Sequence, residues 1–488
     1  MIVAIAMLVA AAPASAASFA PSPGTYTVDT SALTLTGPGT TISGSDQGGI
    51  AVFSFDSVSI PAGVFLEVEG SRPFKLLASG ELAVGGVIEA SGFDAEGFIN
   101  GPFAGGPGGG AGGVDGTDPG KGPGGGGVSP FERNGGGGGG FGGAGARGGV
   151  DSSEPEPPGL GGSPYGDLNV AIQGGSGGGG GSNVGGGGGG GAVALFGSTV
   201  RIFSGAEVFA EGGSGAIGDT GASGGGSGGG IVLHGENVVM DGLLSAAGGN
   251  GGEGGCCGDG GGGGGGRIAL QYGTLSMAGT TNVSGGISGF PGGGDSSTEP
   301  TGAVGVVTKV GPPTATTSPA SAVGNTTATL NGLVNPSSNA TTYRFEYGTT
   351  TAYGTQTPVA TVGSDGSDHA VSQAIAGLAP NSTYHYRVAA TNALGFVTVG
   401  ADVAFATPAA SPPPTCVVPR LKGKKVKAAR KALTKAHCGV GKVKRSFSGK
   451  VKKGRVIKQG PKPGKVLPAG GKVRITISKG KKGGGRRH

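Results

Sequence analysis

The sequence has no tryptophan, few other aromatic residues and few charges. Aromatic side chains make up 5% and charged side chains 13% of its 488 residues, and hydrophobic residues reach only 35%. This composition excludes a single dense core for a chain of this length. The charged share, about half of the usual 25%, also excludes a highly charged disordered polymer. A modular extracellular or scaffold-like chain with several small cores remains.

Acidic residues are missing from one end of the chain. Residues 411–488 hold 25 of the 35 Lys and Arg and no Asp or Glu, whereas residues 1–410 hold the other 10 basic residues and all 29 acidic ones. The net charge of +6 therefore hides a strongly cationic C-terminal region and a mildly acidic remainder. Such asymmetry predicts an anionic partner for the C-terminal region.

The N-terminus has the pattern of a signal peptide. An apolar run from Ile2 to Ala12 is followed by Ala14-Ser15-Ala16, although no positive charge precedes the run. This pattern predicts a signal peptide over residues 1–16. The run is too short for a transmembrane helix, which needs about 20 apolar residues, and no other stretch qualifies. We therefore expect a secreted protein without an integral membrane span.

Residues 17–310 contain an apolar repeat between glycine-rich inserts, and Gly makes up 119 residues of the chain. Period-two alternation interrupted by Gly marks short strands, and self-similar copies favour stacked coils. We therefore expect a glycine-rich β-solenoid, or β-helix, in which residues 49–70 form an earlier copy. The four clearest copies are 72–92, 191–212, 230–248 and 266–285, and their aligned apolar positions are Leu76, Leu195, Leu233 and Leu270, then Leu82, Val200, Val238 and Leu275, then Val84, Ile202, Met240 and Met277.

The glycine inserts leave two structures open. Runs such as 135–140, 185–191 and 260–266 have no side chains to bury and carry the largest entropy cost on ordering. They form either flexible loops or segments that pack backbone against backbone, because no Cβ keeps their peptide groups apart. Cys256 and Cys257 lie inside one insert, and a vicinal disulfide, a link to another chain and free thiols all remain open.

No catalytic or metal site is predicted in this region. Glycosidases need clustered carboxylates, whereas Glu67, Glu69, Glu81 and Glu89 alternate along strands as a solvated face does. His234 stands alone. A calcium repeat needs its Asp at a fixed place, and Asp115, Asp219, Asp259 and Asp295 share no common frame. We therefore expect a scaffold without a cofactor or metal.

Residues 311–408 are richer in Thr, Tyr and Val. Tyr343, Phe345 and Tyr347 alternate with polar residues, and short strands between Gly, Pro and Asn turns predict a small β-sandwich. The stretch Leu378-Ala379-Pro380, followed by Tyr384, Tyr386, Val388, Ala390, Asn392 and Gly395, resembles the sixth-strand signature of fibronectin type III domains. The resemblance implies that Tyr384 is the corner tyrosine, with its hydroxyl bonded to upstream backbone, and that the domain is a spacer.

A Pro-rich linker, residues 409–415, leads to the basic module. Val426, Ala429, Ala432, Leu433 and Ala436 form a helical apolar stripe opposite Lys427, Arg430, Lys431 and Lys435. Strands are expected at 440–444, 454–459 and 472–478, in the order β-α-β-β-β. Cys416 and Cys438 bracket the first strand and the helix, and the predicted secretion favours a disulfide between them. Zinc would need two more ligands, and only His437 is nearby.

The basic module, residues 416–480, resembles the PASTA domain of bacterial cell-wall proteins. The matching residues are Val418-Pro419, Leu421-Lys422-Gly423, the helix at 428–436, the strand at 453–459, Pro461, Pro463-Gly464 and the closing 473–478. The resemblance implies an α+β fold and binding to uncrosslinked peptidoglycan or its stem peptides. The chain departs from the family in having one copy and a large excess of Lys and Arg.

We therefore expect a mainly β, multi-domain, secreted protein attached noncovalently to cell-wall peptidoglycan or anionic wall polymers. Lys452, Lys453 and Arg455 are the predicted wall-polymer contacts, and residues 481–488 are expected to be a disordered basic tail. Nucleic acid is disfavoured because Phe447 is the only aromatic residue after Phe405. The alternatives are a β-helix polysaccharide-degrading enzyme with accessory modules and an adhesin that binds through its glycine-rich face.

Overall fold

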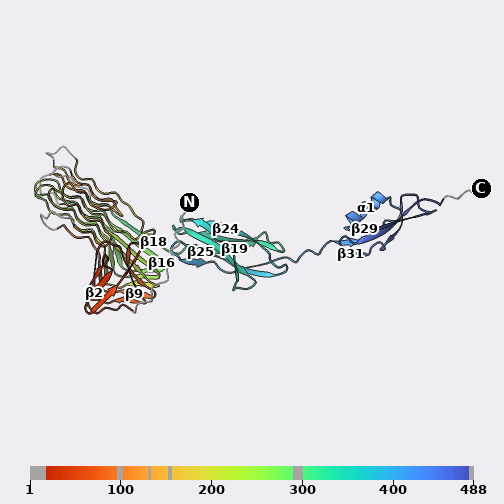
Figure 1. The fold of residues 1–488 in the computed structure, drawn as a ribbon, viewed down its shortest axis with the longest axis horizontal. Coiled ribbons are helices and arrows are strands. Elements are labelled where there is room, and N and C mark those ends of the chain that lie inside the picture. The colour runs from red at the N-terminus through yellow and green to blue at the C-terminus, as the bar shows by residue number, and fades with distance from the viewer. Residues whose placement is uncertain (1–17, 96–102, 130–132, 152–156, 290–300, 483–488) are drawn as a thin grey trace, which may run out of the picture. The chain divides into compact units, whose positions relative to one another are not determined.

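The computed structural model describes residues 18–95, 103–129, 133–151, 157–289 and 301–482 (Figure 1). Within these ranges the chain is mainly β, with strands β1 to β32 and one helix, α1. The expected signal peptide, residues 1–16, lies outside the described residues, as do residues 483–488 of the expected tail. No helix in the described ranges is long and apolar enough to cross a membrane.

The apolar repeats build a ten-stranded sheet in which most neighbours are parallel. Its order is β4-β5-β8-β11-β14-β12-β9-β6, with β16 paired to β14 and β18 paired to β16. The strands are β4 (Ser45–Gln47), β5 (Ile50–Phe55), β6 (Val58–Ile60), β8 (Phe74–Ala78), β9 (Glu81–Val84), β11 (Ala192–Phe196), β12 (Thr199–Ile202), β14 (Gly230–Met240), β16 (Arg267–Met277) and β18 (Val306–Val310).

The copies pair in the register that their alignment predicts. Leu76, Leu195, Leu233 and Leu270 are successive partners across β8, β11, β14 and β16. Leu82, Val200, Val238 and Leu275 form the second row, and Val84, Ile202, Met240 and Met277 the third. All but the β16 members of the second and third rows are buried, so each inward row forms one stripe of a continuous core.

A second, eight-stranded sheet faces the same core. Its order is β17-β15-β13-β10-β7-β1-β2-β3, parallel from β17 to β1 and antiparallel from β1 to β3. The strands are β1 (Gly24–Asp29), β2 (Thr34–Gly37), β3 (Thr40–Ser43), β7 (Val64–Glu69), β10 (Val87–Glu89), β13 (Glu207–Phe209), β15 (Leu243–Ser245) and β17 (Thr280–Asn282).

The described glycine inserts are ordered segments that bond to one another laterally. Along residues 224–229 the backbone N–H groups point in three directions in turn, to three different neighbouring segments, with N···O distances of 2.7–3.0 Å. The direction repeats every three residues, and no hydrogen bond forms within the segment. Both features are those of a polyproline II-type helix. The donor and acceptor pairs are Gly224–Gly179 and Ser227–Ser176, then Gly225–Gly261 and Gly228–Gly264, then Gly226–Gly213 and Gly229–Ala210.

Glycine is required in these segments by close approach. A Cβ on Gly226 would overlap the carbonyl oxygen of Gly188, and one on Gly225 would overlap that of Gly249. The other long runs follow the same pattern, with Gly137 and Gly140 bonded to one segment and Gly139 to another. Of the two structures that the sequence leaves open, backbone-to-backbone packing is therefore the one present.

We predict that Gly226→Ala loosens this packing, because its Cβ cannot fit beside Gly188. Overpacking of this kind costs about 1–3 kcal/mol. Hydrogen-exchange mass spectrometry of the intact chain should show faster exchange over 176–229. Gly116→Ala is the control, since its Cβ would lie 3.3 Å from the nearest neighbouring atom, the Gly181 carbonyl oxygen. Equal exchange in both variants would contradict the prediction.

Residues 311–408 form two antiparallel sheets. Tyr343 and Phe345 of β21 and Tyr384, Tyr386 and Val388 of β25 are buried, as the alternation predicts. The N–H of Val388 donates to the Thr317 hydroxyl of β19 at 3.2 Å, which ties the two sheets together. One sheet is β19 (Thr314–Ser321), β20 (Thr327–Asn335) and β24 (His369–Ala376), and the other is β22 (Thr355–Gln356), β21 (Thr341–Gly348), β25 (Thr383–Asn392) and β26 (Val397–Val399) with β23 (Ala360–Gly363) and β27 (Val403–Ala406).

The basic module packs one helix on a three-stranded sheet. Ala429 and Leu433 of α1 (Val426–Lys435) are buried against Val456, Val473 and Ile475. The sheet order is β29 (Gly439–Ser446), β32 (Lys472–Ser478) and β30 (Val456–Gly460). A separate pair joins β28 (Thr415–Val417) to β31 (Val466–Pro468), so the order is β-α-β-β-β-β, with a short β31 that the sequence pattern did not predict.

Candidate functional site

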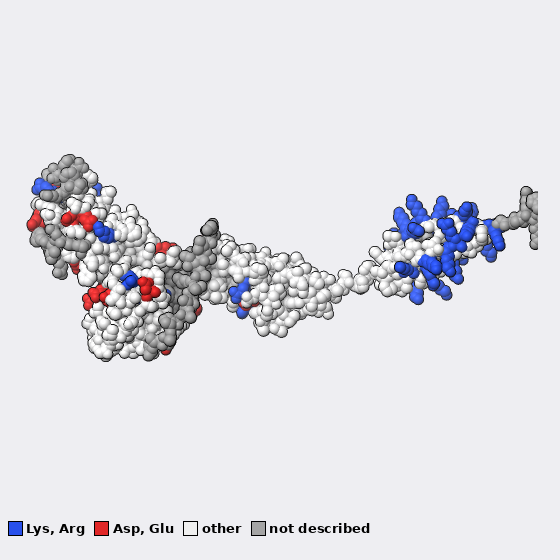
Figure 2. All heavy atoms as spheres, in the orientation of Figure 1, with Lys and Arg blue, Asp and Glu red and all other residues white. Residues whose placement is uncertain are grey.

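The basic module carries cations that no carboxylate within it can neutralise. Residues 416–480 contain 21 Lys and Arg and no Asp or Glu. Figure 2 shows these side chains gathered over the module, whereas charges of both signs are sparse on the rest of the visible surface. In the absence of internal ion pairs, the module attracts anions from solution.

The three predicted contact residues do not play the same part. Lys452 and Lys453 are exposed in the loop that precedes β30. Arg455 is half-buried, and its guanidinium donates to the carbonyl oxygen of Gly423 at 2.8 Å. Lys452 and Lys453 are thus free to meet a ligand, while Arg455 holds the loop that precedes the helix.

Gln459 holds the same loop from its other side. Its Oε1 accepts from the Leu421 N–H at 2.6 Å, and its Nε2 donates to the Pro419 carbonyl oxygen at 2.8 Å. The sequence pattern assigned this side chain no role. Its only signal was a lone amide at the end of a predicted strand.

The open side of the three-stranded sheet carries a row that was also not predicted from the sequence. Thr476 of β32 is the register partner of Lys444 in β29 and of Lys458 in β30. Arg474 lies two residues before Thr476, and therefore on the same side of the sheet. Lys444, Lys458 and Arg474 are exposed and Thr476 is half-buried. We call these four residues the basic sheet face.

Cys416 and Cys438 form a disulfide with Cα atoms 4.8 Å apart. Both half-cystines belong to the module's core. The bond joins β28 to the segment between the helix and β29, and so closes the loop that contains α1.

The outward carboxylates of residues 18–310 lie on different sheets. Glu67 and Glu89 are register partners on β7 and β10, and Glu69 is beside Asp29. Glu81 lies on the other sheet and pairs with Arg201 at 3.4 Å. Among the described residues no group of three or more His, Cys, Asp or Glu is placed to hold a metal ion.

A shallow groove of about 380 Å³ lies along β12, β14 and β16. Its lining mixes small polar residues with Arg201 and three aliphatic residues, and the Thr274 hydroxyl donates to Asn237 Oδ1 at 2.7 Å. Glu81 pairs with Arg201, one of the lining residues, but no carboxylate belongs to the lining. The lining residues are Thr199, Arg201, Asn237, Val238, Val239, Thr274, Leu275 and Ser276.

His234 is held by contacts of its ring with two other side chains. Its Nδ1 lies 3.0 Å from Gln271 Oε1, and its ring stacks on Phe196 at a centroid distance of 4.6 Å. Burial is the main cause that lowers the pKa of His234 below its usual value, and the nearby Lys75 lowers it further.

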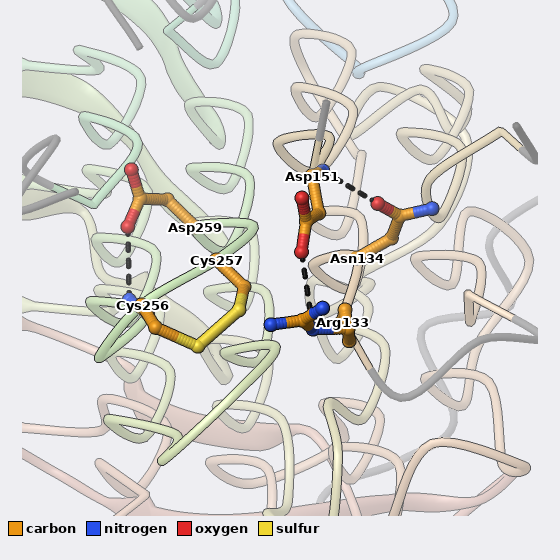
Figure 3. The surroundings of a disulfide bond; sticks show 7 residues. Arg133, Asn134, Asp151, Cys256, Cys257 and Asp259 are labelled. Carbon is orange, nitrogen blue, oxygen red and sulfur yellow. Dashed lines mark hydrogen bonds and ion pairs between the residues drawn. A yellow bond between two sulfur atoms is a disulfide. The ribbon is translucent and has the colours of Figure 1, made fainter. Parts of the chain in front are cut away.

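Cys256 and Cys257 form a disulfide with each other within a glycine insert (Figure 3). Nearby, Asp259 accepts from the Gly254 N–H at 2.8 Å, and Arg133 pairs with Asp151 at 3.1 Å. Of the states that the sequence leaves open, the structure has the vicinal bond within one chain.

Tyr384 and the histidines of residues 311–408 also have partners. The Tyr384 hydroxyl accepts from the Ala379 N–H at 2.9 Å, five residues upstream. His385 pairs with Asp402 at 2.8 Å and His369 with Asp365 at 2.9 Å. These contacts fix turns and strand ends.

Comparison with models of protein families gives a match to the basic module. The family model of the PASTA domain matches residues 417–479. The C-terminal module is a PASTA domain. No curated protein matches the chain in sequence.

Solved structures give only weak similarities. The sensor domain of the anti-sigma factor RsgI4 of Pseudobacteroides cellulosolvens, in its shorter form, is 20% identical with a TM-score of 0.17, over 20% of this chain and 97% of that one. The chitinase ChiW of Paenibacillus sp. str. FPU-7, a cell-surface-expressed multi-modular enzyme, is 9% identical with a TM-score of 0.13. This chain spans 23% of ChiW's length and 72% of its own. At these TM-scores neither similarity bears on the fold or the function of this chain.

We predict that Arg455→Gln destabilises the PASTA domain, because it removes the bond to the Gly423 carbonyl. Loss of a part-exposed hydrogen bond from a charged donor costs about 1–2 kcal/mol. Pulse proteolysis in urea should show a lower unfolding midpoint for the PASTA domain. Lys453→Gln, which removes an exposed cation without such a bond, should leave the midpoint unchanged. Equal midpoints for the two variants would contradict this assignment.

We also predict that the Cys416→Ala/Cys438→Ala variant loses protection across the PASTA domain. A disulfide that closes a loop of this length contributes on the order of 3 kcal/mol. Hydrogen exchange of peptides from 416–478 measures the loss in the intact protein. The control, Cys256→Ala/Cys257→Ala, should leave these peptides at the wild-type rate, and an equal effect of the two double variants would refute a local role.

Proposed function

We propose that this chain is a secreted, non-catalytic structural or adhesive protein of a bacterial cell envelope, held on the wall by its PASTA domain. One observation supports this proposal above the others, namely a PASTA domain with 21 Lys and Arg and no acidic residue. PASTA domains are associated with peptidoglycan, and the unneutralised charge adds attraction to anionic wall polymers.

The disulfides agree with an extracellular location. All four cysteines are paired, as Cys256–Cys257 and Cys416–Cys438. Disulfides persist in oxidising compartments and are rare in the cytosol. The signal peptide predicted over residues 1–16 belongs to the same proposal.

The N-terminal region supplies the scaffold in this proposal. Successive copies of the repeat pair in parallel and share one core, which supports a β-solenoid over residues 17–310. Residues 311–408 act as a fibronectin type III-like spacer between this scaffold and the PASTA domain. The outward carboxylates do not converge on the groove at β12, β14 and β16, which supports a passive scaffold over a polysaccharide-degrading enzyme.

Co-sedimentation with insoluble cell walls tests this function. The intact protein should pellet with walls that retain their anionic polymers, and a chain truncated after Ala410 should stay in the supernatant. Because the Debye length falls from about 8 Å at 0.15 M salt to about 3 Å at 1 M, the charge-dependent part of binding should fall by about tenfold or more. Equal pelleting of the truncated chain would overturn the role of the PASTA domain.

A further inference from the structure

We propose that the basic sheet face, Lys444, Lys458, Arg474 and Thr476, is a binding site for a phosphodiester-linked wall polymer. This inference rests on the proposed wall attachment and adds the ligand class and the residues. It starts from the register of β29, β32 and β30, which places a lysine on each side of Thr476.

The cations of this face lie on three adjacent strands. Neighbouring strands lie about 4.8 Å apart, so the Cα atoms of Lys444 and Lys458 are separated by about 10 Å across the sheet. Arg474 and Thr476 are two residues apart on β32, so their Cα atoms are about 6.6 Å apart. An extended polymer that crosses the strands therefore meets a cation on every strand.

Nothing within the described PASTA domain covers this face. Helix α1 packs on the opposite side of the sheet, where Ala429 and Leu433 share one buried cluster with Val473 and Ile475. Lys444, Lys458 and Arg474 are exposed. Among the described residues the Thr476 hydroxyl has no hydrogen-bond partner, so its donor is available.

The chemistry of the face favours phosphate groups over a stem peptide. Lys, Arg and the Thr hydroxyl present donors, and no carboxylate is available in the module to receive the amino groups of a peptide. Arginine binds phosphate through two parallel N–H···O bonds, and lysine acts as a point charge beside it. A polymer with one negative charge and several acceptor oxygens per repeat matches this donor-only surface.

The outer side of α1 offers a matched comparison. Lys427, Lys431 and Lys435 are exposed and lie one turn apart on one stripe of the helix. They carry the same charge as Lys444, Lys458 and Arg474, but on a convex surface. Both surfaces attract anions at long range, and the sheet face spreads its contacts over three adjacent strands.

The test compares two triple variants of the intact protein for binding of soluble poly(glycerol phosphate) at 0.15 M salt, by isothermal titration calorimetry. Lys444→Gln/Lys458→Gln/Arg474→Gln should weaken binding by about tenfold, since it removes three direct charge contacts that contribute about twofold each. The control, Lys427→Gln/Lys431→Gln/Lys435→Gln, should weaken it by about threefold or less, through screened long-range attraction alone. Exchange rates of β32 amides check that both variants are folded.

Two results would overturn the site. Equal losses in the two triple variants would mean that charge alone binds the polymer. Equal affinity of the wild type for polyglutamate of the same length would mean that the face does not select phosphate.

Pelleting with peptidoglycan stripped of its anionic polymers separates this inference from the proposed function. The sheet-face variant should pellet with stripped peptidoglycan as the wild type does, since the inference assigns only polymer contacts to this face. A wild type that binds poly(glycerol phosphate) and fails to pellet with any wall preparation would defeat the proposed function and leave the site intact.

Discussion

The N-terminal region depends on lateral hydrogen bonds between glycine backbones. Each N–H in a run such as 224–229 donates to a neighbouring segment, and the direction of donation repeats every three residues. The segments lie so close that a Cβ would overlap a neighbouring carbonyl at most positions. Backbone pairing thus replaces the side-chain core that a chain with 5% aromatic residues lacks. The apolar repeats add one conventional core, shared by two sheets whose strands come from successive copies.

Charged residues are distributed as unevenly along the chain as glycine is. The PASTA domain holds its own fold with apolar contacts, one disulfide and the bonds of Arg455 and Gln459 to backbone. Most of its other cations take no part in the fold and remain for a ligand. The glycine-rich region, residues 17–310, holds 25 Asp and Glu against 8 Lys and Arg, so it does not attract the anions that the PASTA domain attracts. The proposed function follows this division, with attachment by the PASTA domain and support by the glycine-rich region.

The sequence allowed some of this structure to be predicted, and the reasons differ by element. The rows through Leu195 and Val200 were predictable because strand pairing follows the period of the apolar repeat. The partners of the glycine segments were not predictable, since every glycine offers the same two backbone groups. Strand β31 was missed because three residues carry too little periodicity.

The basic sheet face was not predicted from the sequence, because a β-bulge changes the side of the sheet on which Lys444 lies. Simple alternation from Val440 places Lys444 on the core side of β29. The register shift between Val440 and Val443 inserts one residue, so Lys444 pairs with Thr476 on the open side. The structural role of Arg455 was also not predicted, because nothing in a run of cationic residues marks the one that bonds to a backbone carbonyl. Its predicted role as a polymer contact is therefore shared with a structural one.

Through-hydrogen-bond scalar couplings in the intact protein, labelled with ¹⁵N and ¹³C at glycine, test the backbone packing most directly. We expect dispersed glycine amide signals and couplings across pairs such as Gly225–Gly261 and Gly226–Gly213. Glycine amide signals collapsed at the random-coil position, with no coupling between segments, would contradict this packing.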